Sequence, residues 1–121
     1  MYGKKTWLIP DGYIPSTSSG SFVSHEAICV LNLSENDAKI NISIYFENDE
    51  PMEGFFAECG KKRTNHIRLD KITDKNGKKI PVDMPYAMKV ESDTPIVVQH
   101  SRMDTSQAEL TLMSTMAFPL D

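Results

Sequence analysis

The chain has 121 residues, of which 40% are hydrophobic and 25% are charged, and its formal net charge is −4 with a pI of ≈ 5.3. This length predicts one domain over residues 1–121 that buries a core without disulfide staples. The acidic balance makes nucleic acid an unlikely partner, because neutralising phosphates requires clustered lysines and arginines.

The first residues and the two cysteines indicate the compartment. No apolar leader segment opens the chain, and no apolar run approaches the ~18 residues of a membrane-spanning helix. We therefore expect a cytoplasmic protein with no direct insertion into a membrane. Cys29 and Cys59 each lie in an apolar stretch and match no metal-binding spacing, so we expect two buried free thiols and no cofactor.

In chain order, the sequence consists of short strand-like segments separated by turn residues. Pro10-Asp11-Gly12 ends the first segment, and Asn76-Gly77 is a strong tight-turn signal. The periodicity is clearest at Ile40–Phe46, where apolar and polar residues alternate, as in a strand with one dry face. The predicted strands cover residues 4–9, 22–33, 40–46, 54–59, 64–69, 87–92 and 95–103.

The tail, residues 107–118, fits two patterns. Leu110, Met113 and Ala117 would form a helical stripe, whereas Leu110, Leu112, Ser114 and Met116 fit one face of a strand. We predict a strand, because every preceding segment has β character. About eight short strands at regular spacing predict an all-β fold, a single-domain β-sandwich of jelly-roll-like type.

Two of the predicted strands are apolar on both faces. In residues 22–33, Ala27, Cys29 and Leu31 share one face while Ile28 and Val30 share the other, and residues 96–98 behave in the same way. Such strands usually lie inside a sheet that is covered on both sides. In a domain of this size the second cover is expected to be another subunit, so the pattern predicts an oligomer.

All three histidines fall inside predicted strands. A metal-dependent enzyme that uses His25, His66 and His100 together with Glu26 is one interpretation, but no HxH or HxxxH pair sets a local chelate. Two other interpretations remain equally open: a buried hydrogen-bond network that fixes strand register, and a pocket for a small polar ligand. Ser24-His25-Glu26 cannot form a catalytic triad, because neighbouring side chains on a strand point to opposite faces.

Several segments together resemble the Anabaena sensory rhodopsin transducer family. The resemblance runs in the same order along nearly the whole chain, and residues 95–109 are its specific part. Its carrying residues are Trp7, residues 12–15 (GYIP), 22–26 (FVSHE), 63–68 (RTNHIR), 95–104 (PIVVQHSRMD), 107–109 (QAE) and Ser114-Thr115.

The resemblance implies a small β-sandwich that assembles as a homotetramer, and a non-enzymatic role in signal transduction. It implies a small-molecule ligand, with a sugar or related metabolite as the expected kind, and a protein partner such as a membrane receptor contacted at its cytoplasmic face. The ligand-binding positions carried over by the matching motifs are His25, Glu26, Arg63, His66, Gln99, His100 and Arg102.

The segment from Asp70 to Pro85 departs from this resemblance. It is longer and more basic than the family pattern implies, with lysines at positions 71, 75, 78 and 79. This departure concerns the choice of partner more than the fold. A purely structural interaction protein, in which the polar cluster is only a hydrogen-bond network, stays open beside the ligand-binding transducer and the metal-dependent enzyme.

Overall fold

The computed structural model describes residues 2–107 and 111–120. These residues form eight β-strands and no helix, so the all-β prediction is confirmed, and the described part of the chain has no helix long and apolar enough to cross a membrane. The strands are β1 Lys4–Gly12, β2 His25–Asn32, β3 Ala38–Phe46, β4 Met52–Cys59, β5 Arg63–Arg68, β6 Tyr86–Asp104, β7 Thr111–Met116 and β8 Phe118–Leu120.

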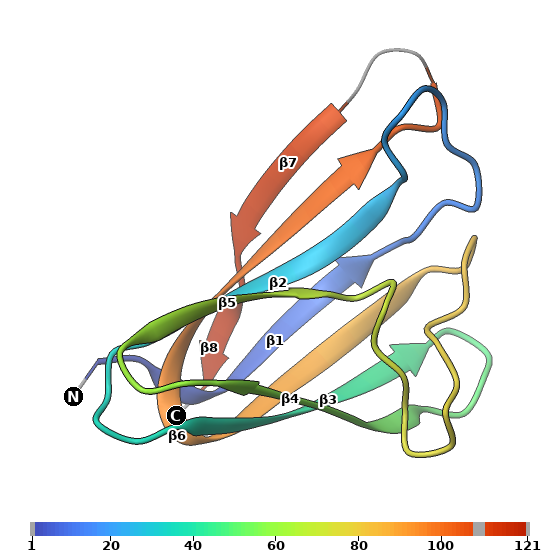
Figure 1. Cartoon of the computed structure of the whole chain (residues 1–121). Helices are drawn as coiled ribbons and strands as arrows, with labels where there is room; N and C mark the ends of the chain where they lie inside the picture. Colours follow the sequence, from blue (N-terminus) through green and yellow to red (C-terminus); the bar gives the residue numbers. More distant parts are fainter. Residues whose placement is uncertain (1, 108–110, 121) are drawn as a thin grey trace.

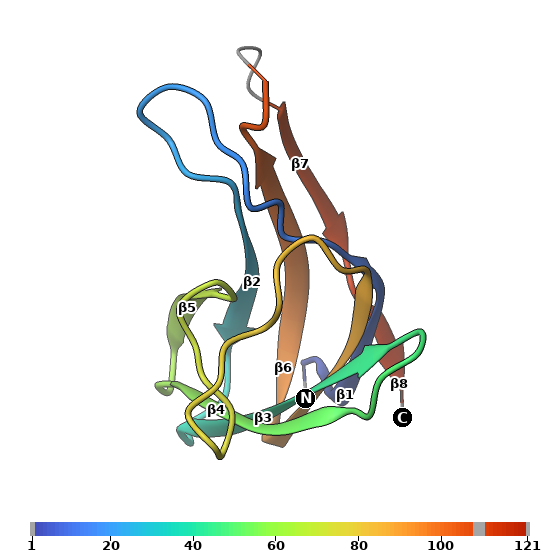
Figure 2. The same cartoon turned by 90° about the vertical axis from the view of Figure 1, so that its right-hand side faces the viewer.

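The 19-residue strand β6 joins the two sheets of the sandwich (Figure 1). Its first half pairs with β1 and β3, which gives the first sheet the order β4-β3-β6-β1-β8. Its second half pairs with β2 and β7, and β5 completes the second sheet beside β2. Every pairing is antiparallel, and Figure 2 shows β6 between β2 and β5 on one side and β1 and β8 on the other.

The sequence prediction of two separate strands, 87–92 and 95–103, is wrong because β6 is continuous. The last pair with β3 joins Ser92 to Ile40, and the first pair with β2 joins Val97 to Leu31. Pro95 lies between these two pairs and has no partner in any described strand pair, although its neighbour Ile96 pairs with Lys4 of β1. A proline is therefore tolerated inside the strand.

The core forms where the two sheets face one another. Ile40, Ile42 and Ile44 of β3 are at most 2% exposed, as their alternation predicts, and Val90 of β6 is completely buried beside them. The indole N–H of Trp7 donates hydrogen bonds to the carbonyl oxygens of Lys4 and Ile96, at 3.0 Å and 3.1 Å. These bonds satisfy the one polar group of a buried tryptophan.

The tail forms strands β7 and β8, so the strand prediction for residues 107–118 is confirmed where the structure describes them. Residues 108–110 of that prediction, including Glu109 of the matching motif, lie outside the described residues. Both cysteines are free, as expected. Cys59 is buried, but Cys29 is only partly buried, because it faces outward from the second sheet.

An Ile44→Asp substitution should abolish folding, because it places an unpaired charge in the dry core at a cost close to the whole stability of a small domain. The matched control is Tyr45→Asp, which places the same charge on the adjacent, exposed position of β3. Circular dichroism and thermal unfolding should show a folded control and an unfolded Ile44→Asp. A cooperatively melting Ile44→Asp variant would contradict the assigned register.

Candidate functional site

A fully buried carboxylate, that of Glu26 on β2, forms the centre of the candidate site. Its Oε2 accepts hydrogen bonds from the backbone N–H of Tyr13 and from Nε of Arg102, both at 2.8 Å. Its Oε1 accepts a short hydrogen bond from the Tyr86 hydroxyl and one from Nε2 of His100 at 3.1 Å. Four donors thus replace the water that a buried carboxylate loses.

Strand register places these groups together. Glu26 lies directly opposite Arg102 in the β2–β6 pair, and His100 is two residues earlier on the same face of β6. Tyr86 comes from the opposite end of β6. If the strand were straight, Tyr86 would lie about 50 Å from Arg102. The shared contact with Glu26 is possible because β6 bends between the two sheets (Figure 1).

Gly12 makes room for the Tyr86 ring. These two residues face each other in the β1–β6 pair, and a Cβ atom at position 12 would lie 2.5 Å from the ring. A larger residue would push the tyrosine away from Glu26. The sequence motif that contains Gly12 therefore has a packing role at this site.

The surroundings set the protonation of the cluster. Burial alone would raise the pKa of Glu26, but the hydrogen bonds from His100, Tyr86 and the Tyr13 N–H, together with the charge of His100, lower the pKa below its usual value. Burial, and then the negative charge of Glu26, raise the pKa of Tyr86 far above its usual value. The cluster therefore holds an ionised glutamate against a neutral tyrosine.

Arg102 connects this buried cluster with an open cavity. Its side chain is 21% exposed, and its Nη2 lies 3.7 Å from the exposed Asp11 carboxylate. The cavity has a volume of about 300 Å³ and is lined by residues from β1, the end of β6, β7 and β8: Leu8, Ile9, Pro10, Asp11, His100, Arg102, Met113, Thr115, Met116 and Phe118. Polar groups fixed by Glu26 thus meet an apolar wall.

The structure divides the seven predicted ligand-binding residues into separate groups. Glu26, His100 and Arg102 come together at the cavity. The cross-strand register places His66 and Gln99 beside Cys29 on the outer face of the second sheet, on the side opposite to His100. The remaining two residues also lie apart from Glu26: His25, on the outer face, and Arg63, which is exposed and bonded to the Lys62 carbonyl.

The three histidines therefore do not converge on one metal site. His25 and His66 project from the outer face of the second sheet, whereas His100 projects inward to Glu26. Among residues 2–107 and 111–120, no group of three or more His, Cys, Asp or Glu side chains is arranged to hold a metal ion. The spacing argument from the sequence agrees with this separation.

Sequence reasoning missed Tyr86 and the contributions of Tyr13 and Asp11. Tyr86 shares a face with Met88 and Val90, both buried, so the period-two pattern of residues 86–90 would place its hydroxyl in the core. A buried tyrosine hydroxyl needs a hydrogen-bond partner, and that requirement is the available signal. Tyr13 contributes only its backbone N–H, which no sequence pattern identifies.

The fold and the site together define a small β-sandwich domain in which a buried carboxylate orients polar groups at an open cavity. The family model of the Anabaena sensory rhodopsin transducer matches residues 2–119. The chain belongs to this family, as the resemblance in its motifs implies.

Solved structures show the same relationship. A Thermotoga maritima protein, described as "Thermotoga maritima 1070", is 38% identical, with a TM-score of 0.89 over 99% of this chain and 97% of that chain. The Anabaena sensory rhodopsin transducer is 37% identical, with a TM-score of 0.76 over 88% of this chain and 94% of that chain. A search of curated proteins found no match.

Replacing Glu26 with Gln should give a pH-dependent loss of stability. Because the folded-state pKa of Glu26 is lowered, its stabilisation is present above its ordinary value of 4.5 and is lost as the pH falls through the lower folded value. At pH 7 the variant should lose about 3–5 kcal/mol, the usual cost of removing one partner from a buried ion pair. Urea unfolding between pH 7 and pH 3 measures the difference.

The matched control for this series is Glu58→Gln, since Glu58 is exposed on β4. Its stability should stay close to that of the unmodified protein throughout the series. A gap between Glu26→Gln and the unmodified protein that stays constant down to pH 3 would show that Glu26 has no lowered pKa.

Proposed function

We propose that this protein is a non-enzymatic, cytoplasmic signal-transducer domain that binds a small polar ligand, a sugar or a related metabolite, and relays its state to a protein partner. Membership of the transducer family supports the signalling role. The observation that carries the ligand role is the buried Glu26 carboxylate, which fixes Arg102 and His100 at the edge of an open cavity.

The cavity has the chemistry of a site for a small polyol or sugar acid. Glu26 holds Nε of Arg102, so the direction of the guanidinium is set before a ligand arrives. Thr115 adds a hydroxyl, and Phe118 adds an aromatic face on which a sugar ring can pack. A volume of about 300 Å³ lies at the small end of ligand pockets, which suits a monosaccharide-sized molecule.

The proposed protein partner is a membrane receptor contacted at its cytoplasmic face. One structural relative is described as the Anabaena sensory rhodopsin transducer, and a rhodopsin is a membrane receptor. By likeness with that relative, we propose the same kind of partner for this chain.

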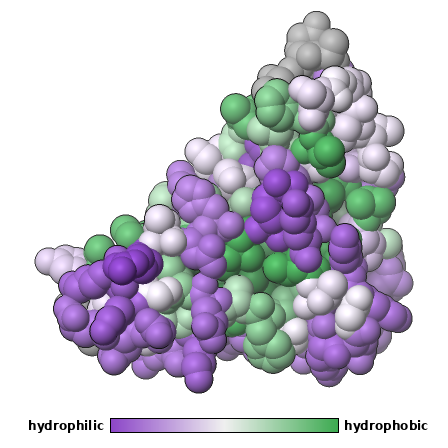
Figure 3. All heavy atoms as spheres, in the orientation of Figure 1, coloured by the Kyte–Doolittle hydropathy of each residue, from purple (hydrophilic) through white to green (hydrophobic). Residues whose placement is uncertain are grey.

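The outer face of the second sheet supports assembly into a homotetramer. Leu31 and Leu112 project from this face and are 40% and 67% exposed, and Val23 beside it is 62% exposed. Figure 3 shows apolar residues gathered over the upper part of the molecule, where β7 lies. Covering such a face with another copy would remove apolar area from water.

A structural role for the Glu26 cluster is the second candidate, and its complete burial favours it. In that case the cluster would only fix β6 between the sheets, and the protein would act through its surface. The separation of the histidines argues against the third interpretation, the metal-dependent enzyme.

A thermal-shift screen tests the ligand role. The compounds are neutral sugars, sugar acids and divalent metals, and the metals are tested with a chelator as well. A bound sugar at about 100 times its Kd should add about 2.7 kcal/mol of stability, which shifts the Tm by several degrees in a domain of this size. The response should disappear in Thr115→Val, which changes the cavity wall without touching Glu26, and in Arg102→Lys. The exposed Arg63→Lys is the matched control and should keep the full response. A metal-only response, or no response to any sugar, would overturn the sugar-binding role.

The assembly is tested separately by size-exclusion chromatography with light scattering. The unmodified protein should have four times the monomer mass of 13.6 kDa. Leu112→Glu should dissociate the tetramer, whereas Tyr2→Glu, a control at an exposed residue outside the strands, should leave it intact. A monomeric unmodified protein at micromolar concentration would contradict the homotetramer.

A further inference from the structure

The described sheets end in four edge strands, which differ in how they are protected against pairing with another chain. β4 and β8 are the edges of the first sheet, and β5 and β7 are the edges of the second. An edge strand exposes backbone N–H and C=O groups that can pair with a further strand. Proteins usually block such an edge with charges, with proline, by keeping the strand short, or with a covering loop.

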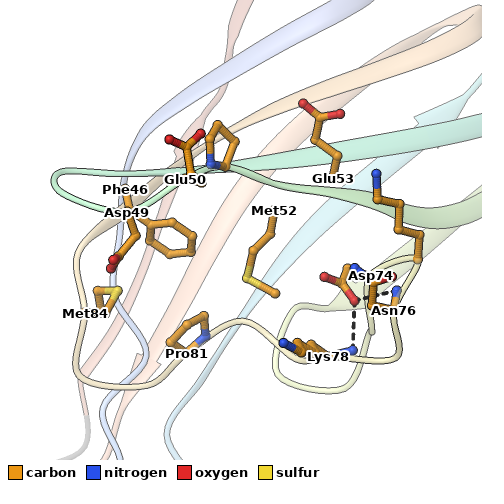
Figure 4. Close-up of a pocket in the computed structure, with 12 residues that line it drawn as sticks. Phe46, Asp49, Glu50, Met52, Glu53, Asp74, Asn76, Lys78, Pro81 and Met84 are labelled. Atoms are coloured by element: carbon orange, nitrogen blue, oxygen red, sulfur yellow. Dashed lines mark hydrogen bonds between the residues drawn. The ribbon is translucent and has the colours of Figure 1, made fainter.

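Segment 70–85 covers the edge at β4. The backbone N–H of Lys75 donates to the carbonyl oxygen of Glu53 at 3.5 Å. The turn around Lys75 packs against Gly54, where a Cβ atom would lie 2.8 Å from Cβ of Lys75, so only glycine permits this approach. Figure 4 shows the segment on one side of a cavity of about 560 Å³ and the β3–β4 hairpin on the other. The segment therefore occupies the place beside β4 that a further strand would need.

Two of the other edges are protected by their own residues, whereas β7 is not. β5 carries Arg63 and Arg68, and β8 has only three residues, one of which is Pro119. The sequence of β7, TLMSTM, contains no charged residue and no proline, and all six residues are exposed. Among the residues that the structure describes, β7 pairs with β6 alone (Figure 1). β7 is therefore the least protected edge of the described sandwich.

One hydrogen bond at the end of β7 shows which of its backbone groups face the open edge. The N–H of Ala117 donates to the carbonyl oxygen of Val98 on β6 at 3.2 Å, in line with the β6–β7 register. Successive residues of an antiparallel strand direct their N–H and C=O groups to alternate sides. Every second residue before Ala117 therefore faces β6, and the residues between them face the open edge: Leu112, Ser114 and Met116.

The open edge is complementary to itself. Two antiparallel copies of β7 that are centred on Ser114 place the two Ser114 residues opposite each other and Leu112 opposite Met116 of the second copy. In this register the N–H and C=O groups of all three edge-facing residues find partners. These side-chain pairs are apolar against apolar and hydroxyl against hydroxyl, and no like charges meet. A second copy of β7 is thus a matching occupant for this edge.

We propose that β7 pairs with β7 of a second copy of this chain about a two-fold axis, so that the second sheets of the two copies form one continuous sheet. This inference rests on the proposed homotetramer and names one of its contacts. A tetramer with two-fold symmetry uses more than one kind of interface, and the outer face of the second sheet supplies the other.

The pairing also brings the second copy to the cavity beside Arg102. Met113 and Thr115 line this cavity and lie directly opposite Arg102 and His100 in the β6–β7 register. In the proposed pair, Thr115 of the second copy lies beside Met113 on the same face, about 5 Å away. The second copy therefore extends the wall of the cavity, and the two cavities of the pair lie on one face of one sheet.

Ser114→Pro tests the pairing, because it removes an N–H at the open edge but no hydrogen bond to β6. The matched control is Ser114→Ala, which keeps the N–H. In size-exclusion chromatography with light scattering, the control should keep the mass of the unmodified protein, and Ser114→Pro should have about half of that mass. Circular dichroism checks that the proline variant is folded. A folded Ser114→Pro with the full mass would overturn the pairing.

Disulfide crosslinking tests the register without a proline, in a Cys29→Ala background that lacks the partly buried thiol of the outer face. Ser114→Cys places two thiols opposite each other with their Cα atoms about 5.5 Å apart, which is within disulfide range. Leu112→Cys is the matched control on the same exposed face, where the two Cα atoms would lie roughly 14 Å apart. After mild oxidation, a non-reducing gel should show a covalent dimer for Ser114→Cys alone, and any other pattern would overturn the proposed register.

Neither measurement involves a ligand, so the β7 pairing and the sugar-binding role at Arg102 can fail independently. A dimeric unmodified protein that Ser114→Pro makes monomeric would contradict the homotetramer but support the pairing. A monomeric unmodified protein would overturn both the pairing and the homotetramer.

Discussion

The contact of both ends of β6 with one buried carboxylate is the constraint on which the rest of the structure depends. Tyr86 at the start of this strand and Arg102 near its end both donate to Glu26. They can do so only because β6 changes partners between Ser92 and Val97 and bends from one sheet into the other. These hydrogen bonds therefore connect the two sheets where the two ends of β6 meet at Glu26. The apolar core connects the sheets in the space between them.

This arrangement also explains why a charge is placed where an apolar residue would pack more simply. A buried ion pair adds little net stability, because desolvation offsets its attraction. Glu26 instead gives Arg102 and His100 fixed directions beside an open cavity, and its position between the sheets connects that cavity to the strands on both sides. Under the proposed function, a ligand at Arg102 would act on the group that sets how the two sheets meet.

The sequence predicted the local elements well and their assembly less well. The alternation of Ile40, Ile42 and Ile44 predicted the dry face of β3 because a strand has a fixed period of two, whatever it packs against. The sequence reasoning failed at residues 93–94, which it took as a break between two strands, because β6 is continuous there and changes partners between Ser92 and Val97. The seven candidate site residues were grouped by motif, and only Glu26, His100 and Arg102 meet. The alternation of side chains between the two faces of a strand, together with the cross-strand register, decides which residues face the cavity.

By itself the sequence determined the all-β class, the approximate positions of most strands, the free cysteines and the family, because these follow from local alternation, turn residues and matching motifs. Only the tertiary structure decided that Tyr86 completes the Glu26 cluster, that His66 and Gln99 lie on the face opposite to His100, and that segment 70–85 encloses a cavity with the β3–β4 hairpin. The physical reason is that these contacts join residues far apart in the chain. Their meeting depends on the bend of one long strand and on a turn packed against a glycine, and neither leaves a periodic trace in the sequence.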